Sequence, residues 1–308
     1  MQMLIGTSVR KRRKNSITHK VVSFFYDFQS ALVTCVFKFI SLSGFGFVNT
    51  KKRGRIMYQN IAKYFIAVLI VGAIGALFFI EPIAQDPNYH NFIDQRMIVS
   101  IPNFWNVISN LPFLIVGFLG LKYLNQLTIS KEMGVAYWLL FFGVLLVGFG
   151  SSYYHLEPNN HTLVWDRLPM TLAFMSLFAV IVSEFVNERR GAMLLIPLLV
   201  VGVFSVFYWQ WTESNGVGDL RLYALVQFLP MVIIPVVLLV YPSRFSHLSA
   251  YWWLLMAYLL AKLFEYFDVQ IYSFLGGVIS GHSLKHAIAA LGMYVLLQSY
   301  RRRKAKTA

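Results

Sequence analysis

Eight apolar runs, each about 20 residues long, follow one another through most of this 308-residue chain. They cover residues 61–80, 104–124, 134–155, 166–186, 191–210, 220–240, 250–270 and 282–300. A helix needs about 20 apolar residues to cross the hydrocarbon core of a bilayer, and lipid offers no partner for an unpaired backbone group. The sequence therefore predicts an all-α polytopic transmembrane helical bundle with eight spans.

The composition supports a membrane protein, because 57% of the residues are hydrophobic and only 13% are charged. Soluble domains carry about 25% charged residues. This difference excludes a cytosolic enzyme, a disordered scaffold and a disulfide-stapled secreted domain. Cys35 is the single cysteine, so any bound metal has to be held by nitrogen and oxygen ligands.

The net charge of +14 is unevenly distributed along the chain. Residues 1–63 contain 12 of the 27 lysines and arginines with one acid, and the remainder stand mostly in short clusters between apolar runs. Basic clusters beside membrane spans indicate the cytoplasmic side. Because residues 51–63 and 301–304 are both basic, an even number of spans predicts cytoplasmic N and C termini. No polar domain carries a basic groove, so nucleic acid is not expected as a partner.

Residues 1–56 differ from the rest of the chain. They begin and end with basic clusters and enclose an apolar stretch that is interrupted by Asp27, Gln29 and Lys38. This extension fits a poor or interfacial helix, a targeting segment, or upstream sequence from a misassigned start, because Met57 begins a cleaner membrane-protein sequence. We assign the eight spans to one transmembrane domain, residues 57–308.

Polar residues that carry chemistry stand at the ends of three apolar runs. Ser151 and His155 close the third run, Asp166 opens the fourth, and His282 and His286 open the last. In the predicted topology all three ends lie at the non-cytoplasmic face. Polar groups are costly inside a membrane, so their convergence on one face predicts a functional site.

The spacing of these residues indicates a metal-dependent hydrolase. His282 and His286 are four residues apart and therefore share one helix face. With His155 as the third ligand they form a facial zinc site that leaves a fourth tetrahedral position for water. Asp166 is then the general base, and Ser151 polarises the scissile carbonyl or holds its developing oxyanion.

Simpler interpretations stay open for each of these residues. The histidines fit interhelical hydrogen bonding, and Asp166 fits an ion pair with Arg167. Ser151 fits close helix packing, with Ser152 as a rival for its role. His90 is expected to be a solvated loop residue or to take a backbone role in a calcium-binding loop.

The motifs resemble those of the alkaline ceramidases, whose wider superfamily of seven-helix membrane hydrolases includes the adiponectin-receptor-like proteins. The resemblance rests on Ser-x-x-x-His, on an Asp eleven residues later, and on the late His-x-x-x-His, and it covers residues 86–300. Residues 103–111 (NFWNVISNL) are similar to the stretch that opens the first core helix of ceramidases. The resemblance implies a seven-helix catalytic core, with 61–80 as an additional N-terminal span.

The same resemblance implies a ceramide-like substrate and specific residue roles. His155, His282 and His286 would bind Zn²⁺, Asp166 would activate water, and Ser151 would assist the hydrolysis of the amide to a fatty acid and an amino-lipid base. The family's Ca²⁺ site near the amino terminus retains fewer carboxylates here, which weakens Ca²⁺ binding. Its candidate ligands are Asp86, Asn88, Asp94 and Asn103.

Three functions remain in competition at this point. The first is an intramembrane zinc hydrolase of a lipid amide, which needs the bilayer and a lipid substrate but no obligatory protein partner. The second is a receptor-like membrane protein with a structural zinc. The third is a transporter with a His/Asp proton relay, which is disfavoured because the ionisable residues cluster at one face instead of crossing the bilayer.

Overall fold

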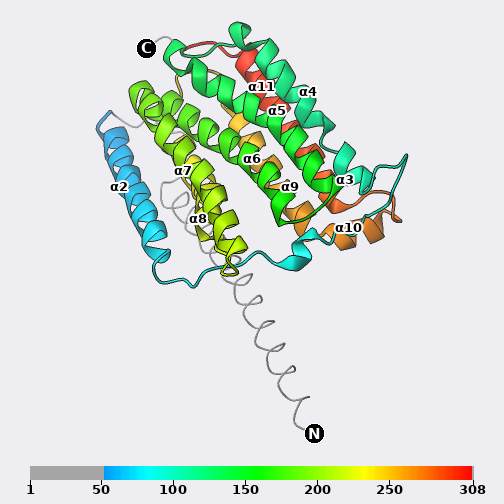
Figure 1. Ribbon diagram of the computed structural model, residues 1–308. Coiled ribbons are helices and arrows are strands. Elements are labelled where there is room, and N and C mark those ends of the chain that lie inside the picture. The colour runs from blue at the N-terminus through cyan, green and yellow to red at the C-terminus, as the bar shows by residue number, and fades with distance from the viewer. Residues whose placement is uncertain (1–51, 307–308) are drawn as a thin grey trace. The chain divides into compact units, whose positions relative to one another are not determined.

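The computed structural model describes residues 52–306, so residues 1–51 of the predicted extension lie outside the described residues. The chain divides at Met57 into two units, Met1–Met57 and Tyr58–Ala308. The helices are α2 (Lys52–Ala76), α3 (Phe104–Ile108), α4 (Leu111–Lys122), α5 (Gly134–Leu156), α6 (Asn160–Ile181), α7 (Glu188–Ser214), α8 (Arg221–Val240), α9 (Ser249–Tyr266), α10 (Asp268–Phe274) and α11 (Gly281–Arg302). Within the described residues, extended pairing is limited to two isolated bridges, Ile98–Ile101 and Phe245–Ala305. The predicted all-α bundle is confirmed (Figure 1).

Six helical segments among the described residues are long and apolar enough to cross a membrane. They are Ile56–Ala76, Phe104–Lys122, Gly134–Leu156, Asn160–Val186, Glu188–Ser214 and Arg221–Val240. The chain is therefore a multi-pass membrane protein. Helices α9 and α11 fall outside this set and carry several ionisable residues, including Lys262 and Lys285. That they also cross the bilayer stays a prediction.

Helix α6, which corresponds to the predicted run 166–186, begins earlier than its apolar residues indicate, at Asn160. Asn159 caps α6 through a capping box with Thr162, whose backbone N–H bonds the Asn159 side chain at 2.9 Å. A capping box satisfies backbone donors that the first turn leaves free. The polar first turn therefore belongs to the helix, and Asp166 lies in its second turn instead of at its start.

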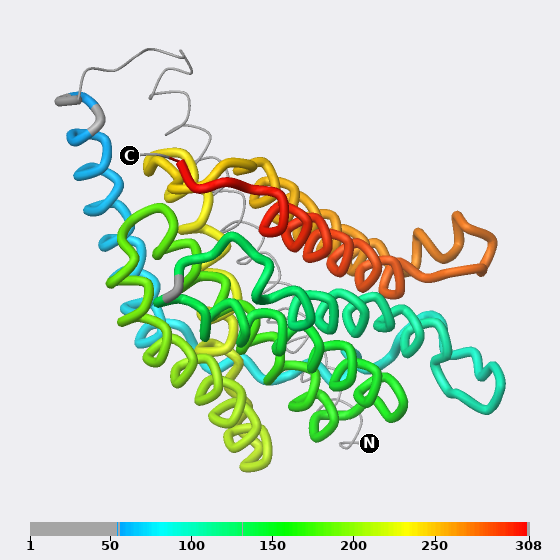
Figure 2. Tube along the Cα trace, turned by 90° about the horizontal axis from the view of Figure 1, so that it is seen from above, coloured from blue at the N-terminus to red at the C-terminus, as the bar shows by residue number. Residues whose placement is uncertain are grey.

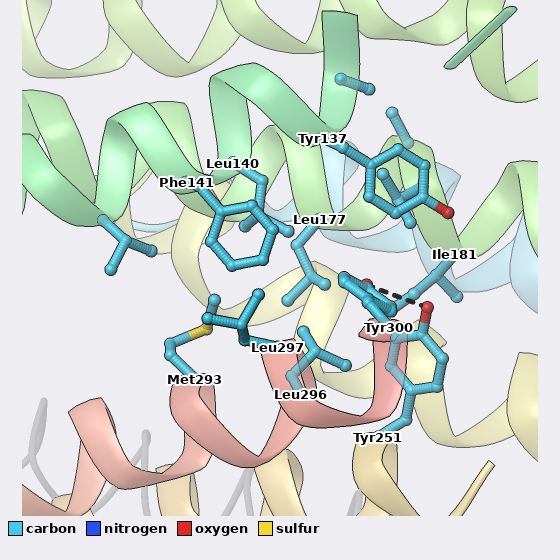
Figure 3. Close-up of a cluster of buried hydrophobic side chains, with 14 of the residues drawn as sticks. Tyr137, Leu140, Phe141, Leu177, Ile181, Tyr251, Met293, Leu296, Leu297 and Tyr300 are labelled. Atoms are coloured by element: carbon cyan, nitrogen blue, oxygen red, sulfur yellow. Dashed lines mark hydrogen bonds between the residues drawn. The ribbon is translucent and has the colours of Figure 1, made fainter. Parts of the chain in front are cut away.

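Helices that are neighbours in sequence are mostly neighbours in space. α5 packs between α4 and α6, α7 packs against α6, and α11 lies along α9 with its other side on α4 (Figures 1 and 2). Figure 3 shows the main apolar core, in which Phe141 of α5 and Leu177 of α6 meet Leu296 and Leu297 of α11. This cluster lies where α5 and α9 begin and where α6 and α11 end.

A buried ion pair closes this end of the bundle. Glu184, in the π-helical turn Val182–Val186 that follows α6, accepts a bond from Arg303 Nη1 at 2.7 Å, with side-chain exposures of 2% and 1%. Tyr251 donates to the other Glu184 oxygen at 2.8 Å, and the Tyr137 hydroxyl also donates to Glu184. The Tyr251 and Tyr300 hydroxyls are 3.1 Å apart (Figure 3). A buried charge is tolerated only when it is paired in this way.

We expect Glu184→Ala to destabilise the protein by about 3–5 kcal/mol, because it leaves the buried Arg303 guanidinium without its carboxylate. The matched control is Glu188→Ala, which removes the exposed ion pair between Glu188 and Arg244. Exposed pairs contribute only about 0–1 kcal/mol. Thermal unfolding of both variants in detergent measures the difference, and equal losses would contradict the assignment of Glu184 to a buried pair.

Candidate metal centre

Two glycines allow the helices that carry the site to approach closely. A methyl group on Gly150, next to Ser151 in α5, would overlap the Trp165 carbonyl oxygen of α6. A methyl group on Gly281, next to His282 in α11, would overlap the Phe264 carbonyl oxygen of α9. Small residues at helix contacts let backbones approach one another in membrane proteins. The two glycines therefore bring the polar residues that follow them into the interior of the bundle.

Three histidines from two helices meet at this end of the bundle. His155 lies in the last turn of α5, and His282 and His286 lie on the first two turns of α11. Ser280 caps that helix by accepting a 3.1 Å bond from Ser283 N. All three rings are buried, and each offers a ligand nitrogen within 4.8 Å of the others. The Nε2 atoms of His155 and His282 are 3.3 Å apart.

Neighbouring polar groups hold each of these histidines. The Ser109 hydroxyl is 2.8 Å from His286 Nδ1, which leaves Nε2 as the free nitrogen of that ring. The Asn103 amide donates to the His155 carbonyl at 2.9 Å, and the Asp268 carboxylate accepts the backbone N–H of His282 at 2.7 Å. His155 Nδ1 is buried without a hydrogen-bond partner among the described residues.

Ser151 and Asp166 lie on adjacent helices. Ser151 is buried on α5, one turn before His155, and Asp166 is half-buried on α6, which packs against α5. Ser152, the rival for the role of Ser151, donates to the Val107 carbonyl at 3.2 Å and so packs against α3. Close helix packing and a polar contact thus coexist at residues 150–152.

Arg167 does not pair with Asp166, although the two are adjacent in sequence. Its Nη2 donates to the Gln85 side-chain oxygen at 2.6 Å, and its guanidinium lies 4.1 Å from the Trp209 ring centre and 4.7 Å from that of Tyr223. Among the ion pairs within residues 52–306, none involves Arg167 or Asp166. Successive helical residues point about 100° apart, which sends the two side chains to different neighbours.

The segment before α3 covers the histidines. The Phe92 ring packs 4.7 Å from the His155 ring and 4.5 Å from the His282 ring. His90 was expected to be solvated, but its two ring nitrogens lie 2.9 Å from the Tyr154 hydroxyl and 2.9 Å from the Asn160 side-chain oxygen. The expectation is wrong because this segment folds over the end of the bundle instead of extending into water.

Three of the four residues proposed for a Ca²⁺ site already have partners for side-chain oxygens in the protein. Asp94 is buried and ion-paired with Arg96 at 2.6 Å, and Asp86 accepts the Asn88 backbone N–H at 2.9 Å. The Asn88 side-chain oxygen accepts a bond of 3.4 Å from Asn91. Asn103 is committed to the His155 carbonyl through its amide nitrogen. Ca²⁺ binding by these residues stays a prediction.

Sequence reasoning missed two residues at the centre. Phe92 carried no signal because an aromatic residue in a loop is common. Lys285 could have been found by its position between the two histidines of α11. Lys285 Nζ is 3.0 Å from Glu265 Oε1, and Lys262 Nζ is 2.7 Å from Glu265 Oε2.

Comparison with known proteins agrees with this geometry. The family model of the ceramidases matches residues 90–306, from the segment over the histidines to the end of the bundle. No curated protein and no solved structure matches the chain. A match over most of the chain, together with the apolar helices, means that this chain belongs to the ceramidase family of membrane hydrolases, which act on the amide bond of ceramide.

Proposed function

We propose that this protein is a zinc-dependent intramembrane hydrolase that cleaves a ceramide-like amide to a fatty acid and an amino-lipid base. The observation that carries the proposal is the convergence of His155, His282 and His286, whose ligand nitrogens lie within 4.8 Å of one another. Among the described residues, this is the one group of three histidine, cysteine or acidic side chains that lie close enough together to share a metal ion.

The donor set fits zinc. Two nitrogens that bind Zn²⁺ tetrahedrally at about 2.0–2.1 Å would be about 3.3 Å apart, and the Nε2 atoms of His155 and His282 are 3.3 Å apart. Three neutral imidazoles leave a fourth position open, as in catalytic zinc sites. The contact between Ser109 and His286 Nδ1 supports the fit, because zinc-binding histidines are usually oriented through their second ring nitrogen.

The reaction assigns distinct roles to Asp166 and Ser151. Zinc, when bound, polarises the scissile carbonyl and makes the attacking water more acidic. Asp166 accepts the proton of that water as its oxygen adds to the carbonyl carbon. Asp166 then passes the proton to the amide nitrogen as the C–N bond breaks, which releases the amine and the fatty acid. Ser151, one turn before His155 on α5, orients the Asp166 carboxyl group by donating a hydrogen bond to it.

The proposed orientation puts the histidines near the non-cytoplasmic surface and both termini in the cytoplasm. Basic residues at the opposite helix ends support it. Lys122 ends α4, Arg189 and Arg190 begin α7, and Arg301 ends α11. Positive charge gathers on the cytoplasmic side of membrane proteins. A lipid amide would then enter laterally, with its chains among the apolar helices and its amide at the histidines.

We expect about one zinc ion per chain in protein purified in detergent without chelators. His282→Ala should lose the metal, and Ser109→Ala should weaken zinc affinity about 10- to 100-fold because His286 loses its orienting partner. His161→Ala is the matched control, since His161 is exposed at the start of α6. Elemental analysis after dialysis measures all three. Full zinc content in His282→Ala would refute the ligand assignment.

Asp166→Asn should keep the zinc and lose hydrolysis, because the amide cannot accept the proton of the attacking water. General-base catalysis contributes about 10²–10⁴-fold, which sets the expected fall in kcat. Glu157→Gln, an exposed acid at the same end of the bundle, is the control and should stay active. Fatty acid release from ceramide in mixed micelles is the readout, and wild-type rates in Asp166→Asn would exclude Asp166 as the base.

A further inference from the structure

Lys285 is a charged residue at the metal centre that the proposed mechanism does not use. It lies three residues after His282 and directly before His286, on the second turn of α11. Its ammonium group is 3.0 Å from Glu265 Oε1 on the neighbouring helix α9, and its side chain is 18% exposed. A lysine that is mostly buried in a helix bundle is costly, so its presence calls for a role.

The ion pair with Glu265 does not by itself explain Lys285. Lys262 already binds the other oxygen of the same carboxylate, with Nζ 2.7 Å from Oε2. One lysine is enough to neutralise the Glu265 carboxylate, so the second lysine leaves one positive charge in excess. An ammonium group has three N–H donors. The Glu265 bond uses one of them, and Lys285 has no other hydrogen-bond partner within residues 52–306.

Lys285 lies on the side of α11 that carries the histidines, because it follows His282 by three residues and directly precedes His286. Glu265 holds its ammonium group from the α9 side. An anchored cation with free donors beside a hydrolytic centre suits a negative oxygen that forms during the reaction.

We propose that Lys285 is a catalytic residue that binds the negative oxygen derived from the substrate carbonyl. It donates an N–H to the oxyanion that forms when water adds to the amide, and it keeps its proton throughout. After the C–N bond breaks, the same donor binds the fatty acid carboxylate. The inference rests on the proposed hydrolysis for its catalytic part, whereas carboxylate binding can be measured independently.

The test compares three variants of the full chain. Lys285→Met removes the cation, Lys285→Arg keeps it, and Lys262→Met removes the other lysine from the same carboxylate. Lys285→Met leaves Glu265 paired with Lys262, so no unpaired buried charge is created. Each variant is assayed for zinc content, for kcat and KM with ceramide in mixed micelles, and for equilibrium binding of radiolabelled palmitate, with hexadecanol as the uncharged probe.

We expect Lys285→Met to keep its zinc and its KM while kcat falls about 10²–10³-fold, the usual effect of removing an oxyanion donor. Its affinity for palmitate should fall about tenfold, with hexadecanol binding unchanged. Lys285→Arg should retain most of the activity and of the palmitate affinity. Lys262→Met should resemble the wild type, because Lys285 remains in place.

Several results would overturn the inference. The first is a wild-type kcat and palmitate affinity in Lys285→Met, and the second is loss of zinc in that variant. The third is an equal loss of activity and palmitate affinity in Lys262→Met, which would mean that both lysines are structural. If the wild type fails to hydrolyse ceramide but binds palmitate through Lys285, the proposed function fails and the carboxylate site stands. If palmitate binding is also independent of Lys285, both are wrong.

Discussion

The cost of leaving a polar group unpaired inside a bilayer controls how this bundle is built. Most of the length of the helices is apolar, and buried polar side chains gather near the two ends. At one end Arg303 is paired with Glu184 and surrounded by tyrosines. At the other end lie the histidines, Asp166 and the lysines on Glu265. Because neighbouring helices run in opposite directions, residues distant in sequence meet at each end.

The two ends of the bundle differ in how completely their polar groups are paired. This difference distinguishes the end that stabilises the fold from the end that carries the candidate site. Both Glu184 oxygens and the Arg303 guanidinium have partners in the protein. At the histidines, the Nε2 atoms of His155 and His282 face each other, and His155 Nδ1 has no partner among the described residues. Polar groups that are paired within the protein stabilise the fold, whereas polar atoms without a partner are available to bind a metal ion or a substrate.

The segment between α2 and α3 encloses the centre from outside the bundle. Phe92 covers two of the histidine rings, Gln85 accepts a bond from Arg167, and His90 bridges α5 and α6 through Tyr154 and Asn160. An apolar cover that excludes water strengthens the electrostatic interactions beneath it. Trp209 of α7 and Tyr223 of α8 belong to the same buried apolar cluster as Phe92 and support this cover.

The sequence by itself determined the fold class and the histidine cluster. Apolar runs of membrane-spanning length require helices, and four-residue spacing puts His282 and His286 on one face whatever the packing. Hydropathy could not place the start of α6, because its first turn is polar and depends on the Asn159 cap. Only the tertiary structure decided the partners of each group: Ser109 for His286, Gln85 for Arg167, and Glu265 for Lys285. These contacts join residues far apart in the chain, and their distances depend on helix packing that no local pattern encodes.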